Sequence, residues 1–554
     1  MPTKRIAAQR ALQKLWNIDA ALSEDEDQPM GSDDEPERND SDEELHEWNS
    51  DDNGSSLESD NESVNSSISS LENQLLSGRD GTLWNRVENN HAISVGRFPA
   101  HNIFSGTPGV KAFAKRKIDS PLSAWRLIVS EGMLKLIQKY TIMKGKEASS
   151  DWCISLQELD AFLGLLYLRG VLGFRRHSIN SIWSSQFGSP YFREVMSRNR
   201  FREILRFLRF DEQCSRRQRV EQDKYAHFRE IFDLFVSNCL QVYTPNPFLT
   251  VDEQLLPLKN RCCFIQFMPN KPDKFGIKYW ILSDVKTKFV INQMPYLGAH
   301  DRNERCGLRL GDFVVRKLME PFFNKGYNVC TDNFFTSLSL AEHLLVNRTT
   351  LVGTVRLNSR FLSSAHLEKK PLFESTHLSC QNTVTVSYQG KSDKKVIVMS
   401  TFHSTASVRS DEKRKPEMIH FYNKNKTAVD TMDSMLRLYS SKAATARWPV
   451  ATFYDLLDKA ALNAHVIFKD ATGSTIKRRD FIFELATSLC EEFKSRRTAS
   501  PISGELCSEQ PKLKKRKTCS APHCDNKSGA ICHVCSKVYC GKHSQMTVKC
   551  FGCV

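Results

Sequence analysis

The sequence predicts a multidomain protein with a mixed α/β core, helical segments around it and a cysteine-rich tail. Three observations carry this prediction. Apolar residues recur at helical spacing from about residue 120 to residue 245. At Thr244 the pattern changes to short β-rich runs that alternate with helical ones. Seven of the 17 cysteines lie between Cys519 and Cys553. A chain of 554 residues is also too long for one compact core.

Charge is distributed very unevenly along the chain. From Ala21 to Ser63 there are 18 acidic residues and one basic residue, Arg38, so this segment carries −17. The net charge of the whole chain is +14, which leaves +31 for the remainder. Residues 1–95 are therefore expected to be a disordered acidic region. The basic body predicts a polyanionic partner such as nucleic acid.

The sequence has neither a membrane span nor a signal core. No run reaches the roughly 18–20 apolar residues that cross a bilayer, and the start "MPTKRIAAQR" has no apolar core. We therefore expect a soluble intracellular protein without a membrane partner. In that compartment the cysteines are expected to be thiols or metal ligands instead of disulfides.

The elements of the core follow one another in a recognisable order. The strand "FLTVDEQLL" is followed by the β-rich runs "CCFIQFM", "GIKYWILSDV" and "KFVINQMPYLG". Next come the helix "GDFVVRKLME", the strand "YNVCTD", the helix "SLSLAEHLLVN" and the strand "TLVGTVRL". A polar, mixed stretch with β-like pieces separates these from a late helix. This order is that of an RNase H-like fold, with an interruption before its last helix.

Four aspartates stand where such a fold carries chemistry. Asp252 lies within the first strand, Asp332 ends the fourth, and Asp430 and Asp433 begin the late helix. Two divalent cations held by shared carboxylates can promote substitution at a phosphodiester. An acid pair in a first helical turn is also common without metal. The apolar surroundings of Asp252 and Asp332 favour the metal interpretation, because a buried charge needs a partner.

These residues resemble the piggyBac family of DDE transposases over roughly residues 100–554. The matching segments include "LTVDEQLLPLKNRCCFIQFMPNKPDKFGIKYW", "YNVCTDNFFTSLSLAEHLL" and "AVDTMDSMLRLYSSKAATARWPVATFYDLLDKAALNAHVIF". The resemblance implies a cut-and-paste DNA transposase. Such an enzyme nicks transposon ends, forms hairpins, and joins the 3′-OH ends to TTAA targets. The implied partners are double-stranded DNA, comprising terminal inverted repeats and TTAA targets, and a second copy of the chain.

The resemblance also implies roles for the aspartates. Asp252, Asp332 and Asp430 correspond to the catalytic triad, and Asp433 to an additional required carboxylate. Together they would hold two Mg²⁺ or Mn²⁺ ions. Two roles stay open for Asp433: a second ligand, or a residue that orients water.

The domains implied by the resemblance divide the chain into eight parts. A helical dimerization and DNA-binding domain is split in sequence around an RNase H-like catalytic domain, which contains a β-rich insertion. In order, the expected parts are the acidic region 1–95, helical part 96–247, catalytic part 248–358, insertion 359–417, last catalytic helix 418–442, second helical part 443–500, basic linker 501–518 and zinc finger 519–554.

Basic and aromatic residues near these segments are candidate DNA contacts. Phosphate contacts are expected from Lys271, Lys274, Lys278 and Arg356. For the lysines the alternative is a solvated hairpin edge. Arg447 and Trp448 are expected to clamp or stack on DNA, and the alternative for Trp448 is a core anchor at a helix start.

The tail spells C-x4-C-x7-C-x2-C-x4-C-x2-H-x6-C-x2-C, which is eight ligands in four pairs. Short gaps between the pairs favour two cross-braced tetrahedral zinc sites. The first site would use Cys519, Cys524, Cys540 and His543, and the second Cys532, Cys535, Cys550 and Cys553. His523 could replace Cys524, because the family usually opens with C-x2-C. The resemblance implies that this finger binds terminal DNA or aids dimerization.

Two further functions compete with an active transposase. One is a domesticated, catalytically silent protein that keeps the fold and binds DNA or chromatin. The other is a zinc-finger ubiquitin ligase, for which the seven-residue gap is short. All four aspartates are present, which favours a competent enzyme. The basic run "PKLKKRK" predicts import into the nucleus.

Overall fold

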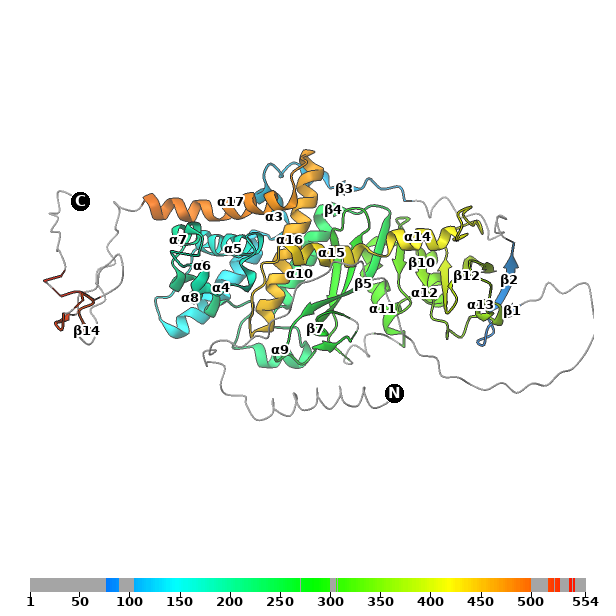
Figure 1. Cartoon of the computed structure of the whole chain (residues 1–554), viewed down its shortest axis with the longest axis horizontal. Helices are drawn as coiled ribbons and strands as arrows, with labels where there is room; N and C mark the ends of the chain where they lie inside the picture. Colours follow the sequence, from blue (N-terminus) through cyan, green and yellow to red (C-terminus); the bar gives the residue numbers. More distant parts are fainter. Residues whose placement is uncertain are drawn as a thin grey trace, which may run out of the picture. The chain divides into compact units, whose positions relative to one another are not determined.

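The computed structural model describes residues 76–88, 104–269, 271–298, 305, 307–499, 517–522, 524–528, 538–540 and 542–543 (Figure 1). The chain divides into two compact units, each built from two segments. The first comprises Met1–Pro108 and Pro245–Met432, and the second Gly109–Thr244 and Asp433–Val554. Within the described part of the chain, no helix is long and apolar enough to span a membrane.

The first unit is built on one 11-stranded mixed sheet. Its strand order is β1-β2-β11-β12-β13-β10-β9-β5-β7-β6, and β8 also pairs with β7. The central strands are β5 (Phe248–Pro257), β6 (Gln266–Phe267), β7 (Phe275–Asp284), β8 (Val290–Pro295), β9 (Asn328–Thr331) and β10 (Thr350–Thr354). β5 and β7 are antiparallel, whereas β9 is parallel to both β5 and β10. The expected run "CCFIQFM" forms only the two-residue β6.

Helices connect the parallel strands, as the apolar spacing predicts. α11 (Leu310–Met319) and the 3₁₀ turn η4 (Glu320–Phe322) precede β9, and α12 (Leu338–Val346) leads from β9 to β10. Pro321 lies in η4 and Gly326 has a φ of 76°, so both mark the end of this helix. Ser337 caps α12 by accepting a hydrogen bond from the backbone N–H of Leu340.

The expected insertion continues the same sheet. β11 (Ser375–Cys380), β12 (Thr383–Lys391) and β13 (Lys394–Ser400) form an antiparallel meander, and β13 pairs with β10. A short helix, α13 (Ser364–Leu367), precedes the meander. After it come α14 (Glu417–Asn425) and α15 (Ala428–Leu438), which are two helices where a single one was expected. Met418 and Ile419 of α14 pack on a core that includes Val352 and Val398.

The expectation of disorder up to residue 95 is wrong for residues 76–88. β1 (Leu76–Ser77) and β2 (Leu83–Val87) form a hairpin, and β2 pairs with β11. Trp84 explains this order, because its indole is fully buried and its Nε1–H donates to the carbonyl of Phe361. The rest of the acidic region lies outside the described residues.

The second unit is helical and draws on both of its segments. Its elements before the sheet are β3 (Gly109–Val110), α2 (Ala112–Lys115), α3 (Pro121–Ile128), α4 (Glu131–Ala148), α5 (Leu156–Val171), η2 (Phe174–Arg176), α6 (Ile179–Ile182), α7 (Pro190–Val195), α8 (Arg198–Phe207), α9 (Arg216–Gln222), α10 (Arg229–Val242) and β4 (Tyr243–Thr244). After the sheet come α16 (Trp448–Thr472) and α17 (Arg478–Ala499).

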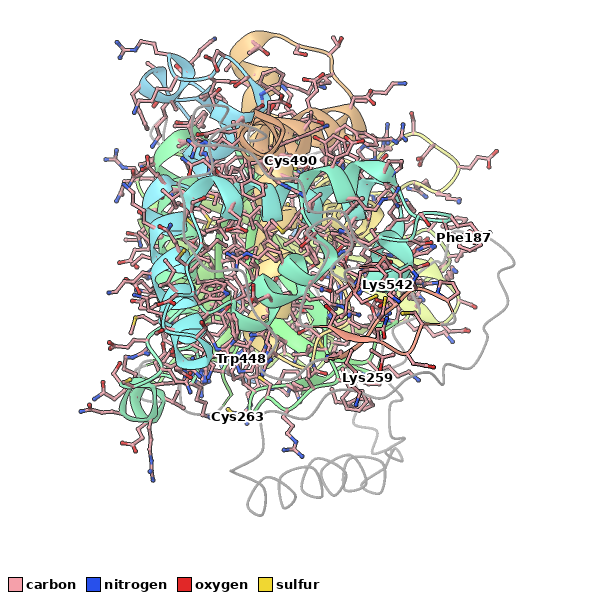
Figure 2. The ribbon with its side chains drawn as sticks, turned by 90° about the vertical axis from the view of Figure 1, so that its left-hand side faces the viewer. Phe187, Lys259, Cys263, Trp448, Cys490 and Lys542 are labelled. Carbon is pink, nitrogen blue, oxygen red and sulfur yellow. The ribbon has the colours of Figure 1, made fainter. Side chains whose placement is uncertain are left out.

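Close packing joins the two segments of this unit. α5 lies against α17, where a Cβ on Gly164 would come within 2.7 Å of the carbonyl oxygen of Ala486. Cys490 of α17 (Figure 2) is buried and its thiol donates to the carbonyl of Ala161. Tyr167 of α5 connects α3 with α16. Its hydroxyl accepts a hydrogen bond from Trp125 Nε1 and donates one to the carbonyl of Leu457, both at 2.8 Å. Residues more than 280 positions apart therefore share one core.

Candidate metal centres

Asp252 and Asp332 lie side by side on neighbouring parallel strands. β5 and β9 pair in register up to Val251 and Thr331, and the two aspartates are the next residues along each strand. Their carboxylate groups come within 4.8 Å of one another at closest approach. The order and pairing of the strands therefore place the carboxylates of Asp252 and Asp332 next to each other.

A turn fixes the orientation of Asp332. The backbone N–H of Phe334 donates to Asp332 Oδ1 at 2.9 Å, and Thr336 Oγ1 donates to the Asp332 carbonyl at 2.8 Å. Thr336 Oγ1 also lies 2.8 Å from Thr331 Oγ1. Gly353 of β10 leaves room for these hydroxyls, since a Cβ there would stand 2.2 Å from Thr336 Oγ1. The turn that positions the Asp332 carboxylate is therefore closely packed against β10.

Glu253 is a third carboxylate of this group, and the sequence analysis missed it. Its side-chain oxygen lies within 4.8 Å of those of Asp252 and Asp332. Strand alternation directs neighbouring side chains to opposite faces, so periodicity argued against pairing Glu253 with Asp252. The one signal was that the two acids are adjacent in "VDEQLL".

Burial and repulsion by neighbouring carboxylates make Asp252 and Asp332 weaker acids than usual. Burial, followed by the charges of Glu253, Asp332 and Asp430, raises the pKa of Asp252 well above its usual range. Burial and the charge of Glu253 raise the pKa of Asp332 to about 6. A half-buried group of carboxylates that repel one another is stabilised by a cation. Oxygen ligands of this kind fit Mg²⁺ or Mn²⁺.

The structure places Asp430 next to this group but outside it. Asp430 lies in the first turn of α15, and its charge contributes to the raised pKa of Asp252. Its Oδ1 lies 3.7 Å from Lys271 Nζ, and 43% of its side chain is exposed. Asp433, which belongs to the second unit, forms an ion pair at 3.1 Å with Arg437 one turn further along α15.

Cations and aromatic rings border the carboxylates. Lys278 Nζ lies 3.7 Å from Glu253 Oε2 and 3.9 Å from the centre of the Trp280 ring. Trp280 stacks on Phe334 at a centroid distance of 5.4 Å, and the exposed Arg356 lies over Phe334 at 5.6 Å. Lys274 is exposed in the turn before β7. Lys271 and Lys278 therefore lie beside the acids, and Arg356 lies over Phe334, two residues from Asp332.

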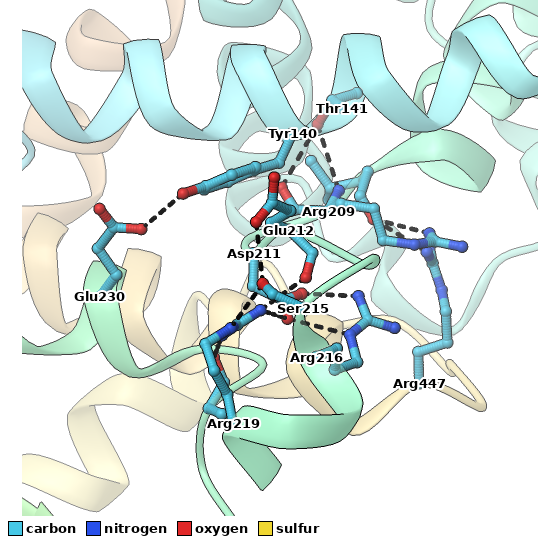
Figure 3. Close-up of polar contacts among 12 residues, drawn as sticks. Tyr140, Thr141, Arg209, Asp211, Glu212, Ser215, Arg216, Arg219, Glu230 and Arg447 are labelled. Carbon is cyan, nitrogen blue, oxygen red and sulfur yellow. Dashed lines mark hydrogen bonds and ion pairs between the residues drawn. The ribbon is translucent and has the colours of Figure 1, made fainter. Parts of the chain in front are cut away.

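Arg447 and Trp448, which are expected to contact DNA, both have partners within the helical unit. The Arg447 guanidinium donates to the carbonyls of Arg206 and Leu208 and to that of Leu205, at the end of α8 (Figure 3). Trp448 is 9% exposed and its ring lies 5.4 Å from that of Tyr225. This burial favours the core-anchor alternative for Trp448.

The first expected zinc site is assembled in the described part of the tail. β14 (Lys517–Thr518) and β15 (Lys527–Ser528) form a small hairpin. Cys519, Cys524, Cys540 and His543 bring their ligand atoms within 4.8 Å of one another. Cys540 Sγ lies 3.8 Å from Cys524 Sγ and 3.4 Å from His543 Nδ1. Two sulfurs about 3.8 Å apart fit tetrahedral zinc at about 2.3 Å from each.

The surroundings of Cys540 favour the thiolate form of its side chain. Against the opposing effect of burial, hydrogen bonds from the backbone of Lys542 and the side chain of Asn526 lower the pKa of Cys540 to about 6. A thiolate is the form that binds zinc. His523 and the expected second site, Cys532, Cys535, Cys550 and Cys553, lie outside the described residues.

The described geometry agrees with comparisons to known proteins. A family model described as "Transposase IS4" matches residues 120–465, which is more than half of the chain. The chain is 22% identical over 378 residues to the human PiggyBac transposable element-derived protein 3, covering 63% of this chain and 62% of that protein. It is 22% identical over 373 residues to the human PiggyBac transposable element-derived protein 2, covering 62% and 60%. The match therefore spans less than two thirds of each relative.

A solved structure gives the same family. The cryo-EM structure of a piggyBac transposase synaptic complex with hairpin DNA matches with a TM-score of 0.69 and 30% sequence identity. The match covers 81% of this chain and 100% of that one. The chain is therefore a member of the piggyBac family of transposases.

Proposed function

We propose that the protein is a cut-and-paste DNA transposase of the DDE type. The proposal rests on the carboxylates of Asp252 and Asp332, which neighbouring strands bring together, and on Asp430 of α15. The strand order β8-β7-β5-β9-β10, with β9 parallel to its neighbours, supports an RNase H-like core.

Asp252, Asp332 and Asp430 would hold two Mg²⁺ or Mn²⁺ ions. Bound cations of this kind stabilise the charge on the attacking and leaving oxygens of an in-line displacement. The rigid turn around Asp332 and the strand position of Asp252 preset the spacing of the ligands. Asp433, which forms an ion pair with Arg437, would add a ligand or orient water.

The cations around the site would hold the DNA backbone. Lys271, Lys274, Lys278 and Arg356 would contact phosphates and position the scissile bond near the carboxylates. Lys278 and Lys271 are paired with acids of the site, so their ammonium groups already lie within it.

One site of this kind can perform each proposed step. Nicking at the 3′ ends, attack of the freed 3′-OH to form a hairpin, and joining to TTAA are all in-line substitutions at phosphodiesters. The related synaptic complex with hairpin DNA supports this sequence. The DNA partners would be the terminal inverted repeats and the TTAA target, bound by a homodimer.

The tail would bind two zinc ions and recognise terminal DNA or aid dimerization. The cluster around Cys540 supports the first ion. Location in the nucleus is proposed from the basic run "PKLKKRK" and the DNA substrate.

A silent, domesticated DNA-binding or chromatin protein is the second candidate. It is favoured by the names of two relatives, which describe them as derived from transposable elements. The two candidates share a fold and differ in whether the carboxylates do chemistry.

An excision assay distinguishes these candidates. The donor plasmid carries a marker between the two genomic sequences taken from either side of this gene, each placed next to a TTAA. We expect excision by the wild-type chain, none by Asp332→Ala, and undiminished excision by the control Asp393→Asn, which changes an exposed carboxylate on the β12–β13 turn. Equal background from wild type and Asp332→Ala would remove the enzyme from consideration and leave the silent protein.

A further inference from the structure

Glu253 has a position that neither the strand pattern nor the family resemblance assigns to a function. Its carboxylate is 16% exposed and lies in the same group as those of Asp252 and Asp332. Two oxygens on opposite sides of one Mg²⁺ stand about 4.2 Å apart, twice the metal–oxygen distance of about 2.1 Å. The separation of at most 4.8 Å in this group is therefore close to that of shared ligands.

The charges around Glu253 leave room for a cation. Asp252, Glu253 and Asp332 lie near the ammonium of Lys278, while Lys271 is paired with Asp430 and Lys426 adds positive charge near Asp430 and Asp252. The carboxylates still repel one another, because the charge of Glu253 raises the pKa of both Asp252 and Asp332. A divalent cation bound among them would relieve this repulsion.

Lys278 does not hold Glu253 tightly. The 3.7 Å between Lys278 Nζ and Glu253 Oε2 is longer than the roughly 2.7–2.9 Å of a charge-assisted hydrogen bond. Lys278 also has a second support, because its ammonium lies 3.9 Å from the Trp280 ring centre and 5.3 Å from that of Phe334. It can therefore give up Glu253 and keep a favourable cation–π contact.

Building on the proposed metal-dependent function, we propose that Glu253 is a further carboxylate ligand of the divalent cation, and that Lys278 competes with the cation for it. Lys278 balances Glu253 while the cation is absent. Binding of the cation frees Lys278 over Trp280, where its ammonium is available to a DNA phosphate. Glu253 thereby couples occupation of the metal site to capture of the substrate backbone.

Mn²⁺ affinity of the full-length, zinc-loaded chain without DNA tests this exchange. The paramagnetic resonance signal of free Mn²⁺ gives Kd without any catalytic readout. We expect Glu253→Gln to weaken Mn²⁺ binding about tenfold or more, in line with the loss of a ligand or its close support. Lys278→Met is expected to tighten it several-fold. The control Lys286→Met removes an exposed ammonium on the β7–β8 turn and should change Kd by less than twofold.

The double variant separates competition at Glu253 from a general effect of charge. If Lys278 acts through Glu253, adding Lys278→Met to Glu253→Gln brings no further tightening. An equal gain in both backgrounds would overturn the exchange, as would a wild-type Kd in the folded Glu253→Gln protein. If Glu253→Gln fails to fold, unchanged affinity in Lys278→Met alone overturns it.

Asp332→Asn distinguishes failure of this inference from failure of the proposed function. Loss of Mn²⁺ binding in Asp332→Asn with normal binding in Glu253→Gln leaves the metal-dependent enzyme standing and removes Glu253 as a ligand. A wild-type protein that binds no Mn²⁺ beyond the level of Asp332→Asn overturns both.

Discussion

Asp252 and Asp332 occupy matching positions at one level of a parallel strand pair, one residue beyond the pairing of Val251 with Thr331. Because adjacent strands are about 4.8 Å apart, this register alone brings two carboxylates within reach of one ion. The arrangement costs stability when no cation is bound, since burial and Glu253 raise the pKa values of both acids.

Asp332→Asn should therefore stabilise the metal-free protein while it abolishes excision. The pKa of Asp332 is about 6 when folded and about 3.9 when unfolded, so folding favours the protonated form. Its contribution is fully present below about pH 4 and is lost as pH rises through 6. Without added Mg²⁺, we expect the variant to raise Tm by a few degrees at pH 8 and to leave it nearly unchanged at pH 4, as read by calorimetry.

The effect of Mg²⁺ on the Tm of both proteins is the control for this prediction. Added Mg²⁺ should raise the Tm of the wild-type chain at pH 8 and have little effect on Asp332→Asn. A variant that is less stable than wild type at pH 8 without Mg²⁺ would show that Asp332 is stabilised by its neighbours in its charged form.

Arg356→Ala should weaken DNA binding in a salt-dependent way. The guanidinium is exposed over Phe334, two residues from Asp332, and each lost phosphate contact lowers the slope of log K against log salt by about 1. Binding of a fluorescent duplex between 50 and 200 mM salt measures this slope. Lys286→Ala removes one exposed charge elsewhere on the sheet and should keep the wild-type slope; an equal drop in both would indicate net charge alone.

Trp448→Ala should destabilise the helical unit without a specific effect on DNA. Truncating a buried aromatic side chain costs about 3–5 kcal/mol, and Trp448 packs against Tyr225 and His227. We expect a lower Tm together with an unchanged salt slope in the protein that remains folded. Trp448→Phe should recover most of the stability. A stable Trp448→Ala with a reduced salt slope would instead support its assignment as a DNA contact.

Asp211 lies between α8 and α9, and its carboxylate pairs with two arginines of α9 (Figure 3). Its removal should also destabilise the protein. Its carboxylate is 5% exposed and accepts from Arg216 at 2.6 Å and from Arg219 at 2.8 Å. Removing one partner of a fully buried ion pair costs about 3–5 kcal/mol, and the cost here is smaller because the side chains of Arg216 and Arg219 are 18% and 37% exposed. Asp211→Ala should therefore lower the denaturant midpoint clearly. Glu212→Gln changes the neighbouring carboxylate and should have a small effect.

The sequence predicted the site best where local pattern and long-range pairing agree. Asp252 lies in a strongly apolar strand and Asp332 directly follows another. The sequence pattern therefore predicts the positions of both aspartates in the sheet. Glu253 was missed because it follows Asp252 inside β5, where strand alternation assigns neighbouring side chains to opposite faces, although their carboxylates lie in one group.

Contacts between distant segments explain the other differences. Trp84 stands in a polar stretch, and its partner Phe361 lies 277 residues away, so no window of local sequence predicts the β1–β2 hairpin. The hydrogen bonds of Arg447 were not predicted, because the carbonyls that accept them, at the end of α8, are some 240 residues earlier. Backbone carbonyls leave no side-chain signature in a sequence.

Zinc content resolves the remaining ambiguity in the tail. With the two-site arrangement we expect two zinc ions per purified chain by mass spectrometry of the metal. Cys524 Sγ lies 3.8 Å from Cys540 Sγ, so Cys524→Ser should reduce the count to about one, whereas His523→Ala should retain two. The reverse result would give the ligand role to His523. Because the Cys519, Cys540 and His543 ligand atoms already lie together, substituting Cys540 should remove the same ion as substituting Cys519. A chain that carries fewer than two zinc ions before any substitution contradicts the two-site arrangement itself.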